Sequence, residues 1–322
     1  MLLNKQTKMM RNFIKYNNGV CVFLCAFFFF SCSNYFKNDY NDNSPTSGKL
    51  KVYIDEGLKH HIKNQAYTFE SIYPNANIYL YSSSENNAIQ KLYNDSCELI
   101  VISRVLNKNE IKSFASKNYT IIPTPIAKSG IAVVTSKNTP INKLSFEEAV
   151  KALNGQNNLF DSLGSPISLS VVFDSPNSSV IHYIQDSVLK NLKIGSNCTV
   201  LNSTLESINY VAHHKNSIAF IDFAWLSDTD DSIFKANESV LKILPLSKKN
   251  SRYYEKPNQS SFKLNTYPFT RTIYAIKKTG EFTLAKGFET FMAGPKGQLT
   301  FLKQGLLPNK QNERSIKIII DP

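Results

Sequence analysis

Short apolar segments alternate with helical segments along the first third of the chain. Residues 49–54, 78–81 and 99–102 have the composition of β-strands, and helices are expected over 58–73, through 88–92 and from about 109. The third strand, Leu99-Ile100-Val101-Ile102, is apolar throughout, which is typical of a parallel sheet covered on both faces. Strand–helix alternation of this kind predicts an α/β fold.

The rest of the chain indicates two lobes rather than one sheet domain. Pro123 and Pro125 interrupt the apolar stretch 121–126, which leads into the apolar run 130–134, and this suits a chain that crosses from one lobe to another. A long strand over Thr266–Ile276 is expected to return across the molecule. The 322 residues allow one large domain or two lobes. We therefore expect lobe 1 to comprise residues 48–126 and 265–322, and lobe 2 residues 127–264.

Local signals place further elements. Ser145 precedes a helical pattern and Glu148 follows three residues later, which predicts a helix that begins with a capping box. A buried strand is expected over 217–221, and residues 228–261 are polar and expected to be rich in loops. Two C-terminal helices are expected over 284–291 and 297–305.

The N-terminus has the composition of a targeting signal. Basic residues precede the apolar run 19–30, which is short for a membrane span and ends in Ser31-Cys32-Ser33. A small residue and a cysteine directly after such a run resemble a bacterial lipobox, which implies that Cys32 is lipidated; a plain signal peptide and an uncleaved anchor are the alternatives. Residues 1–32 are thus expected to be a lipoprotein signal peptide and 33–47 a flexible tether. The expected location is the periplasm or the cell surface, on a membrane.

Charge and residue usage exclude several classes of function. The net charge is +12, and the first 32 residues carry four of these charges and no acid, which leaves +8. Such a balance suits an anionic ligand, a nucleic acid or an anionic lipid surface, but the lysines are scattered and no nucleic-acid motif occurs. Beyond the signal, Cys97 and Cys198 could form a disulfide in an exported protein, but they fall in different expected lobes and are expected to be unbridged thiols. We expect no metal, no cofactor, no enzymatic activity and a monomer.

One stretch has the pattern of an anion cradle. Val171–Tyr183 opens as a buried strand, turns at Pro176 and continues through Asn177-Ser178-Ser179 into a helix that begins near Ser179. A strand, a tight turn and a helix start leave backbone N–H groups pointing at one spot, where the helix dipole adds partial positive charge. Simple capping of the helix is the other interpretation.

Ligands of α/β sheets bind at the carboxyl ends of strands. Hydroxyl groups, carboxylates and one arginine follow the predicted strands there. The candidate binding residues are Asp55, Glu56, Ser83, Ser84, Ser103, Arg104, Asp174, Asn177, Ser178 and Ser179.

Taken together, these segments resemble the phosphate-binding protein family of ABC transporters. The resemblance covers roughly residues 48–308, and its most specific part is C-terminal: Tyr267–Tyr274, Gly287–Phe291, Gly297-Gln298 and Gly305–Pro308. Leu99–Arg104 is similar to the family's third strand, which ends in Ser-Arg. The resemblance implies a type II periplasmic-binding fold, in which two α/β lobes joined by crossing strands close on phosphate.

The resemblance also implies roles for single residues. The family's serine after the second strand falls on Ser83 or Ser84, and its Ser-Gly-Thr helix start falls on Ser178-Ser179-Val180. The chain departs from the family at Asp174, near where an arginine is common, and at Val180, which lacks the threonine hydroxyl.

Arg104 is then expected to supply the positive charge, whereas Glu85 would repel an anion if it pointed inward. Asp55 or Asp174 is expected to accept the proton of hydrogen phosphate and so to reject sulfate. The expected function is phosphate capture for an ABC importer. Binding of another oxyanion or small organic anion, and a protein-contact role without a small ligand, are the alternatives.

Overall fold

The computed structural model describes residues 43–156, 159–160, 164–228, 232–278 and 282–310. The predicted signal peptide, Cys32 and most of the predicted tether lie outside these ranges. Within them, no helix is long and apolar enough to cross a membrane. The described residues form one compact unit.

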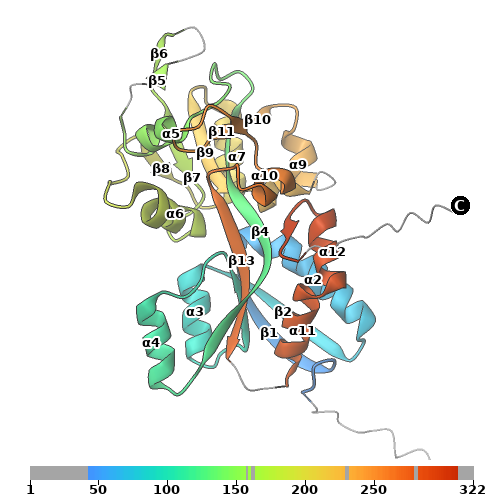
Figure 1. The fold of residues 1–322 in the computed structure, drawn as a ribbon. Helices are drawn as coiled ribbons and strands as arrows, with labels where there is room; N and C mark the ends of the chain where they lie inside the picture. The colour runs from blue at the N-terminus through green and yellow to red at the C-terminus, as the bar shows by residue number, and fades with distance from the viewer. Residues whose placement is uncertain (1–42, 157–158, 161–163, 229–231, 279–281, 311–322) are drawn as a thin grey trace, which may run out of the picture. The chain divides into compact units, whose positions relative to one another are not determined.

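A ten-stranded sheet forms the centre of this unit, in the order β2-β1-β3-β13-β4-β9-β7-β8, with β10 and β14 also paired to β4 (Figure 1). Two small two-stranded sheets, β5-β6 and β11-β12, accompany it. The strands are β1 (Gly48–Asp55), β2 (Ala76–Ser83), β3 (Leu99–Ile102), β4 (Ile121–Ser136), β5 (Leu159–Phe160), β6 (Pro166–Ile167), β7 (Ser170–Phe173), β8 (Cys198–Val200), β9 (Ser217–Asp222), β10 (Leu241–Ile243), β11 (Leu246–Ser247), β12 (Tyr254–Glu255), β13 (Thr270–Lys278) and β14 (Leu307–Pro308).

Helices connect and cover these strands. They are η1 (Glu56–Leu58), α2 (Lys59–Ile72), α3 (Glu85–Tyr93), α4 (Lys108–Ser116), α5 (Phe146–Leu153), α6 (Ser179–Tyr183), its continuation η2 (Ile184–Leu189), α7 (Thr204–His213), α8 (Ala224–Ser227), α9 (Ser232–Asn237), α10 (Gln259–Lys263), α11 (Leu284–Ala293) and α12 (Pro295–Lys303).

The strand β4 changes its partner partway along its length. Residues 121–130 pair with β13, and residues 131–135 pair with β9, in both cases antiparallel. On either side of this point the pairing is parallel, β1 with β2 and β3, and β7 with β8 and β9. The strand β4 itself runs through both expected ranges, 48–126 and 127–264, within one ten-stranded sheet. The two-lobe division therefore stays a proposal.

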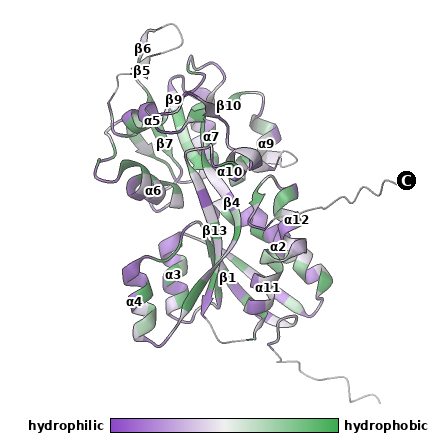
Figure 2. Cartoon of the chain, viewed as in Figure 1, coloured by the Kyte–Doolittle hydropathy of each residue, from purple (hydrophilic) through white to green (hydrophobic). Residues whose placement is uncertain are grey.

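The core lies on both faces of the sheet. All four residues of β3 are buried, as its apolar sequence predicts. Leu99 and Val101 belong to the larger hydrophobic cluster, whereas Ile100 and Ile102 pack with Phe114 and the helices α3 and α4. Figure 2 shows the contrast between the largely hydrophobic strands β7 and β9 and the helices α3 and α4, which also carry hydrophilic residues.

The structure differs from the sequence prediction in three places. The segments 121–126 and 130–134 form one strand, β4, which includes Pro123 and Pro125. The return strand β13 begins at Thr270 rather than at Thr266. The last residues of the predicted tether are attached to the body, since the Leu284 amide donates to Asn43 Oδ1 at 3.1 Å.

The capping box at Ser145 is confirmed. The Ser145 hydroxyl accepts from the Glu148 amide at 3.1 Å, and the Glu148 carboxylate accepts from the Ser145 amide at 2.7 Å. These bonds satisfy N–H groups that would otherwise lack partners at the start of α5.

Replacement of this cap should lower stability measurably. We expect Ser145→Ala to reduce the free energy of unfolding by about 1 kcal/mol, because one helix-end amide loses its acceptor. Urea denaturation measures the change. Ser113→Ala, an exposed substitution inside α4, is the control and should change stability by less than about 0.5 kcal/mol. Equal effects of the two substitutions would contradict the capping assignment.

Candidate functional site

A buried arginine lies where β4 changes its partner. Arg271 of β13 stands opposite Ser129 of β4, and Asp222 of β9 stands opposite Ile131, two residues further along β4. Arg271 forms an ion pair with Asp222, and each side chain is 2% exposed. Binding sites in α/β folds commonly lie where the strand order switches. The region around this ion pair is therefore a candidate binding site.

Arg271 also contacts the side chains of Ser179 and Tyr183. Arg271 donates from Nη1 to the Ser179 hydroxyl at 3.0 Å, and its guanidinium carbon lies 5.9 Å from the centre of the Tyr183 ring. Arg271 Nε has no partner among the described residues. A buried guanidinium N–H without an acceptor is costly, so an acceptor from a ligand would be favourable at this atom.

Asp222 accepts hydrogen bonds from one side chain and one backbone amide. Its Oδ1 accepts from the Ser129 hydroxyl at 3.2 Å and from the Ala224 amide at 2.9 Å, where α8 begins. The segment that follows β1 approaches closely: a Cβ atom at Gly57 would lie 2.9 Å from Asp222 Oδ2. The carboxylate is therefore fixed by groups from β4, α8 and η1.

Asp55, the last residue of β1, is buried beside this pair. Its carboxylate accepts from the Ser103 hydroxyl at 3.3 Å. Burial raises the pKa of Asp55 to about 8, and the nearby Glu85 and Asp222 carboxylates add to the rise, whereas Arg271 and a hydrogen bond from Ser179 oppose it. Asp55 is therefore largely protonated at neutral pH and can donate as well as accept a hydrogen bond.

Glu85 is a third buried carboxylate in this region. It begins α3, is 2% exposed, and accepts from the Ser103 amide at 2.8 Å. Its other oxygen lies 3.4 Å from Arg104 Nε. Glu85 therefore points inward, the orientation in which the sequence analysis expected it to repel an anion.

The structure brings together only some of the residues predicted from the sequence. Asp55, Ser103 and Ser179 meet at the Arg271 cluster, which we define as Asp55, Glu85, Ser103, Ser129, Ser179, Asp222 and Arg271. Ser178 lies next to it but uses its hydroxyl to cap α6, accepting from the Ile181 amide at 3.2 Å. Glu56 and Asn177 are exposed.

Other predicted residues are engaged elsewhere. Ser84 caps α3, and the Ser83 hydroxyl donates to the Ser84 carbonyl at 3.1 Å. Asp174 accepts from the Thr204 hydroxyl at 3.3 Å, and burial raises its pKa.

The side chain of Arg104 is turned toward α4. Its two Nη atoms donate to the two oxygens of Glu110, both at 2.9 Å, and Nη2 also donates to Asn86 at 3.0 Å. Glu110 is the third helical residue in the capping box of α4, so its position is fixed by the helix start. The buried counter-charge of the cluster is thus Arg271 rather than Arg104.

Sequence reasoning missed Arg271 and Asp222, although each left a signal. Arg271 stands at a buried position in β13, in line with Phe269, Ile273 and Ala275. A charge in such an alternation indicates a buried partner. Asp222 is the last residue of β9, a strand that is buried throughout, but its partner lies 49 positions away in sequence.

The cluster can bind a ligand that both donates and accepts hydrogen bonds. Arg271 Nε and protonated Asp55 are donors for an oxyanion, and the hydroxyls of Ser179 and Ser103 can donate to it if they turn away from Asp55. The carboxylates favour a ligand that carries a proton. Among the described residues, no group of three or more His, Cys, Asp or Glu side chains could hold a metal ion.

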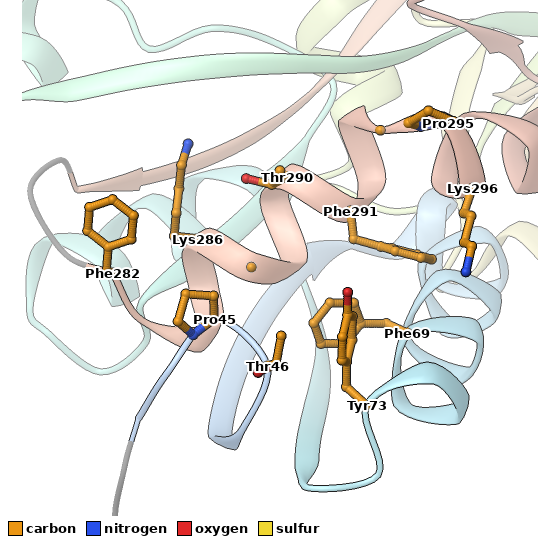
Figure 3. A pocket seen from close by; sticks show the side chains of 12 residues that line it. Pro45, Thr46, Phe69, Tyr73, Phe282, Lys286, Thr290, Phe291, Pro295 and Lys296 are labelled. Carbon is orange, nitrogen blue, oxygen red and sulfur yellow. The ribbon is translucent and has the colours of Figure 1, made fainter.

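An apolar groove of about 640 Å³ lies elsewhere, between the N-terminal segment, α2 and α11. Figure 3 shows the rings of Phe69, Tyr73 and Phe291 gathered on one side of it, with Pro45 and Thr46 across from them. Ring centres of Phe69 and Phe291 are 5.3 Å apart. Its lining is mostly carbon, so this groove does not offer the convergent donors that an oxyanion needs.

Comparison with known proteins places this geometry in context. Over 301 residues the chain is 21% identical to the phosphate-binding protein PstS of Pseudomonas aeruginosa. The aligned region covers 87% of this chain and 89% of that protein.

Solved structures show the same fold. A putative phosphate ABC transporter substrate-binding protein with bound phosphate from Clostridium perfringens aligns with a TM-score of 0.66 and 18% identity, covering 82% of this chain and 100% of the other. An ABC-type phosphate transport receptor from Vibrio cholerae aligns with a TM-score of 0.61 and 14% identity, over 81% and 100%.

These three relatives carry the names of binding and transport proteins rather than of enzymes, in agreement with the sequence prediction. The α/β fold of type II periplasmic-binding proteins, predicted from the sequence, is confirmed by the structural similarity. A family model described as a PBP superfamily domain matches residues 43–296, and the chain therefore belongs to the PBP superfamily.

Proposed function

We propose that this chain is the solute-binding protein of an ABC importer and that it captures phosphate between its two lobes, at the Arg271 cluster. One observation carries the assignment: a buried guanidinium, at the point where β4 changes partner, whose Nε has no acceptor among the residues that the structure describes. The phosphate-binding names of the relatives support the choice of ligand. The protein acts as a monomer that delivers its ligand to a permease.

The ionised form of Asp55, which is present above about pH 8, gives this site a means of selecting phosphate. Hydrogen phosphate carries a proton, so Asp55 and the ligand can share one in either direction: a protonated Asp55 donates to the phosphate, and an ionised Asp55 accepts from it. Sulfate carries no proton at neutral pH and needs the protonated carboxyl. Because the pKa of Asp55 is raised to about 8, sulfate binding should fall above this pH more steeply than phosphate binding.

A second candidate function is a lipoprotein that contacts other proteins and binds no small ligand. The three buried carboxylates Asp55, Glu85 and Asp222 favour it, because they surround a single buried arginine. Binding of a different oxyanion or of a small organic anion uses the same donors. Calorimetry with phosphate, sulfate and molybdate distinguishes the three hypotheses. Phosphate binding predicts heat with phosphate, binding of another oxyanion predicts heat with that anion, and the protein-contact role predicts no heat with any of them.

The export and anchoring of the chain are part of the proposal. Residues 1–32 serve as a signal peptide, Cys32 receives the lipid, and the following residues tether the body on the outer side of a membrane. The small residue and the apolar run directly before Cys32 support this reading. The attachment of Asn43 to the start of α11 indicates that the tether ends near residue 42.

Arg271 and Arg104 offer a matched test of the binding site. The double substitution Arg271→Gln with Asp222→Asn removes both buried charges together, which avoids leaving one of them unpaired. We expect it to weaken phosphate binding by about tenfold to a hundredfold, because a charge-assisted hydrogen bond contributes on the order of 1.5–3 kcal/mol. Arg104→Gln, next to Glu110, should leave the affinity within about threefold.

Isothermal calorimetry measures both affinities, and circular dichroism checks that each variant is folded. The reverse pattern, with Arg104→Gln abolishing binding and the double variant unaffected, would return the counter-charge role to Arg104.

The raised pKa of Asp55 predicts how stability depends on pH. In the unfolded chain this carboxyl titrates near about 3.9, so between about pH 4 and pH 8 the folded state holds a proton that the unfolded state has lost. The stability that this proton contributes is full at low pH and is lost as pH rises through 8.

Asp55→Asn should therefore reduce the loss of unfolding free energy between pH 5 and pH 8, by more than about 1 kcal/mol, in phosphate-free buffer. Asp95→Asn is the control, since Asp95 is largely exposed and Lys278 lowers its pKa. Urea denaturation at the two pH values gives the comparison. Identical slopes for the wild type and Asp55→Asn would show that Asp55 is ionised throughout.

The lipid anchor is tested by Cys32→Ser in the full chain, expressed in a bacterium with lipoprotein processing. The substitution removes the only thiol in Ser31-Cys32-Ser33, so the protein should move from the membrane fraction to the soluble exported fraction. Mass spectrometry of the wild-type N-terminus should find lipid on Cys32. Membrane association that persists in the variant, with no lipid on the wild type, would contradict the assignment.

A further inference from the structure

The apolar groove beside α11 continues into a second hollow. The groove of about 640 Å³ and a cavity of about 350 Å³ share four lining residues, Lys286, Thr290, Gly294 and Pro295. The two hollows are therefore neighbours along α11 and the start of α12. We call them together the α11 groove.

Apolar side chains are exposed along the α11 groove. Phe282 is 84% exposed, and Tyr73 and Phe291 are partly exposed. Figure 3 shows Phe282 at one end of the groove and Lys296 at the other. An exposed apolar hollow of this size commonly marks a surface that binds another group.

A fixed point of the chain lies in the same groove. Lys310 lines the smaller hollow, and its amide donates to Gln298 Oε1 of α12 at 2.8 Å. Gln298 is held in turn, because its Nε2 donates to the carbonyls of Ile126 and Met292, each at 2.7 Å. Any segment that follows Lys310 therefore starts from the lining of the groove.

The sequence that follows Lys310 contains a strongly apolar run. Residues 316–320 are Ile316-Lys317-Ile318-Ile319-Ile320, four isoleucines in five residues. A run of β-branched residues with little charge is prone to aggregate when it is left in water. Its burial against apolar surface is favourable, and the α11 groove is the apolar surface next to its point of attachment.

The length of the chain allows this contact. Six Cα–Cα steps separate Lys310 from Ile316, and in extended form they span roughly 20 Å. The ten residues of α11 rise by about 15 Å, so the run can reach any part of the groove. Asp321, directly after the run, has the charge opposite to that of the exposed Lys296 in the lining.

We propose that residues 315–321 of this chain bind in its own α11 groove, with the isoleucines against Tyr73, Phe282 and Phe291 and with Asp321 near Lys296. Pro45 and Thr46 also line the groove, so the bound segment would join both ends of the described chain on α11. The occupant is a segment of the chain rather than an oxyanion, so this inference does not depend on phosphate binding.

Photochemical cross-linking from Phe282 tests the proposal directly. A benzophenone amino acid in place of Phe282, in the full chain, reacts on irradiation with C–H bonds in contact with it, and mass spectrometry identifies the joined peptides. We expect a product of monomer mass in which position 282 is joined to residues 315–321. Tyr253, which is 83% exposed and outside both hollows, is the matched control position. It should give at least about fivefold less of this product, because the segment is not held beside it.

Substitutions in the apolar run supply the second arm. I316S/I318S/I320S removes three of the apolar side chains and should lower the yield of the product from position 282 at least about tenfold. Lys317→Ser, in the same segment, is the control and should keep the yield of the unsubstituted segment. Circular dichroism checks that each variant is folded.

Four results would overturn the proposal. A cross-linked dimer would assign the groove to a second copy of the chain, and a product joined to residues 33–42 would assign it to the predicted tether. A yield at position 282 no higher than at position 253 would mean that the groove is open to solvent. An unchanged yield in I316S/I318S/I320S would mean that the isoleucines do not hold the segment in place.

Discussion

The ion pair between Arg271 and Asp222 is the interaction on which the candidate site depends. Two buried charges are stable only when the groups around them supply further hydrogen bonds. Ser129 and the Ala224 amide do so for Asp222, and Ser179 does so for Arg271. Removal of one partner alone should cost about 3–5 kcal/mol, because the other charge would stay buried without compensation.

The position of this pair follows from the path of β4. The strand leaves β13 at Gly130 and joins β9 at Ile131, so side chains from strands distant in sequence meet at one point. Asp55 and Ser103 reach the same region from the ends of β1 and β3. A ligand bound there would contact segments from both proposed lobes. Because these contacts can all form only when the lobes are close together, binding would favour the closed arrangement.

The parts of the site that the sequence could predict are those with local causes. Asp55, Ser103 and Ser179 lie at strand ends or at a helix start, and such positions follow from hydrophobic periodicity and capping preferences. The same local reasoning located the strand β3 and the capping box at Ser145.

The role of Arg271 could not be predicted in this way, because it depends on the register between β13 and β4 and on a partner in β9. The orientation of Arg104 was equally out of reach, since it follows from Glu110, whose place is set by the capping box of α4. Strand register and side-chain pairing between distant segments depend on the tertiary structure, so local residue patterns do not predict them.

The central claim is that phosphate binds at the Arg271 cluster, and a crystal structure of the full chain grown with phosphate tests it most directly. The account predicts a phosphate with oxygens within about 3 Å of Arg271 Nε and of the Ser179 hydroxyl, and with another oxygen at the same distance from Asp55. A phosphate found at Arg104, or a cluster without phosphate in a crystal grown at saturating concentration, would contradict it.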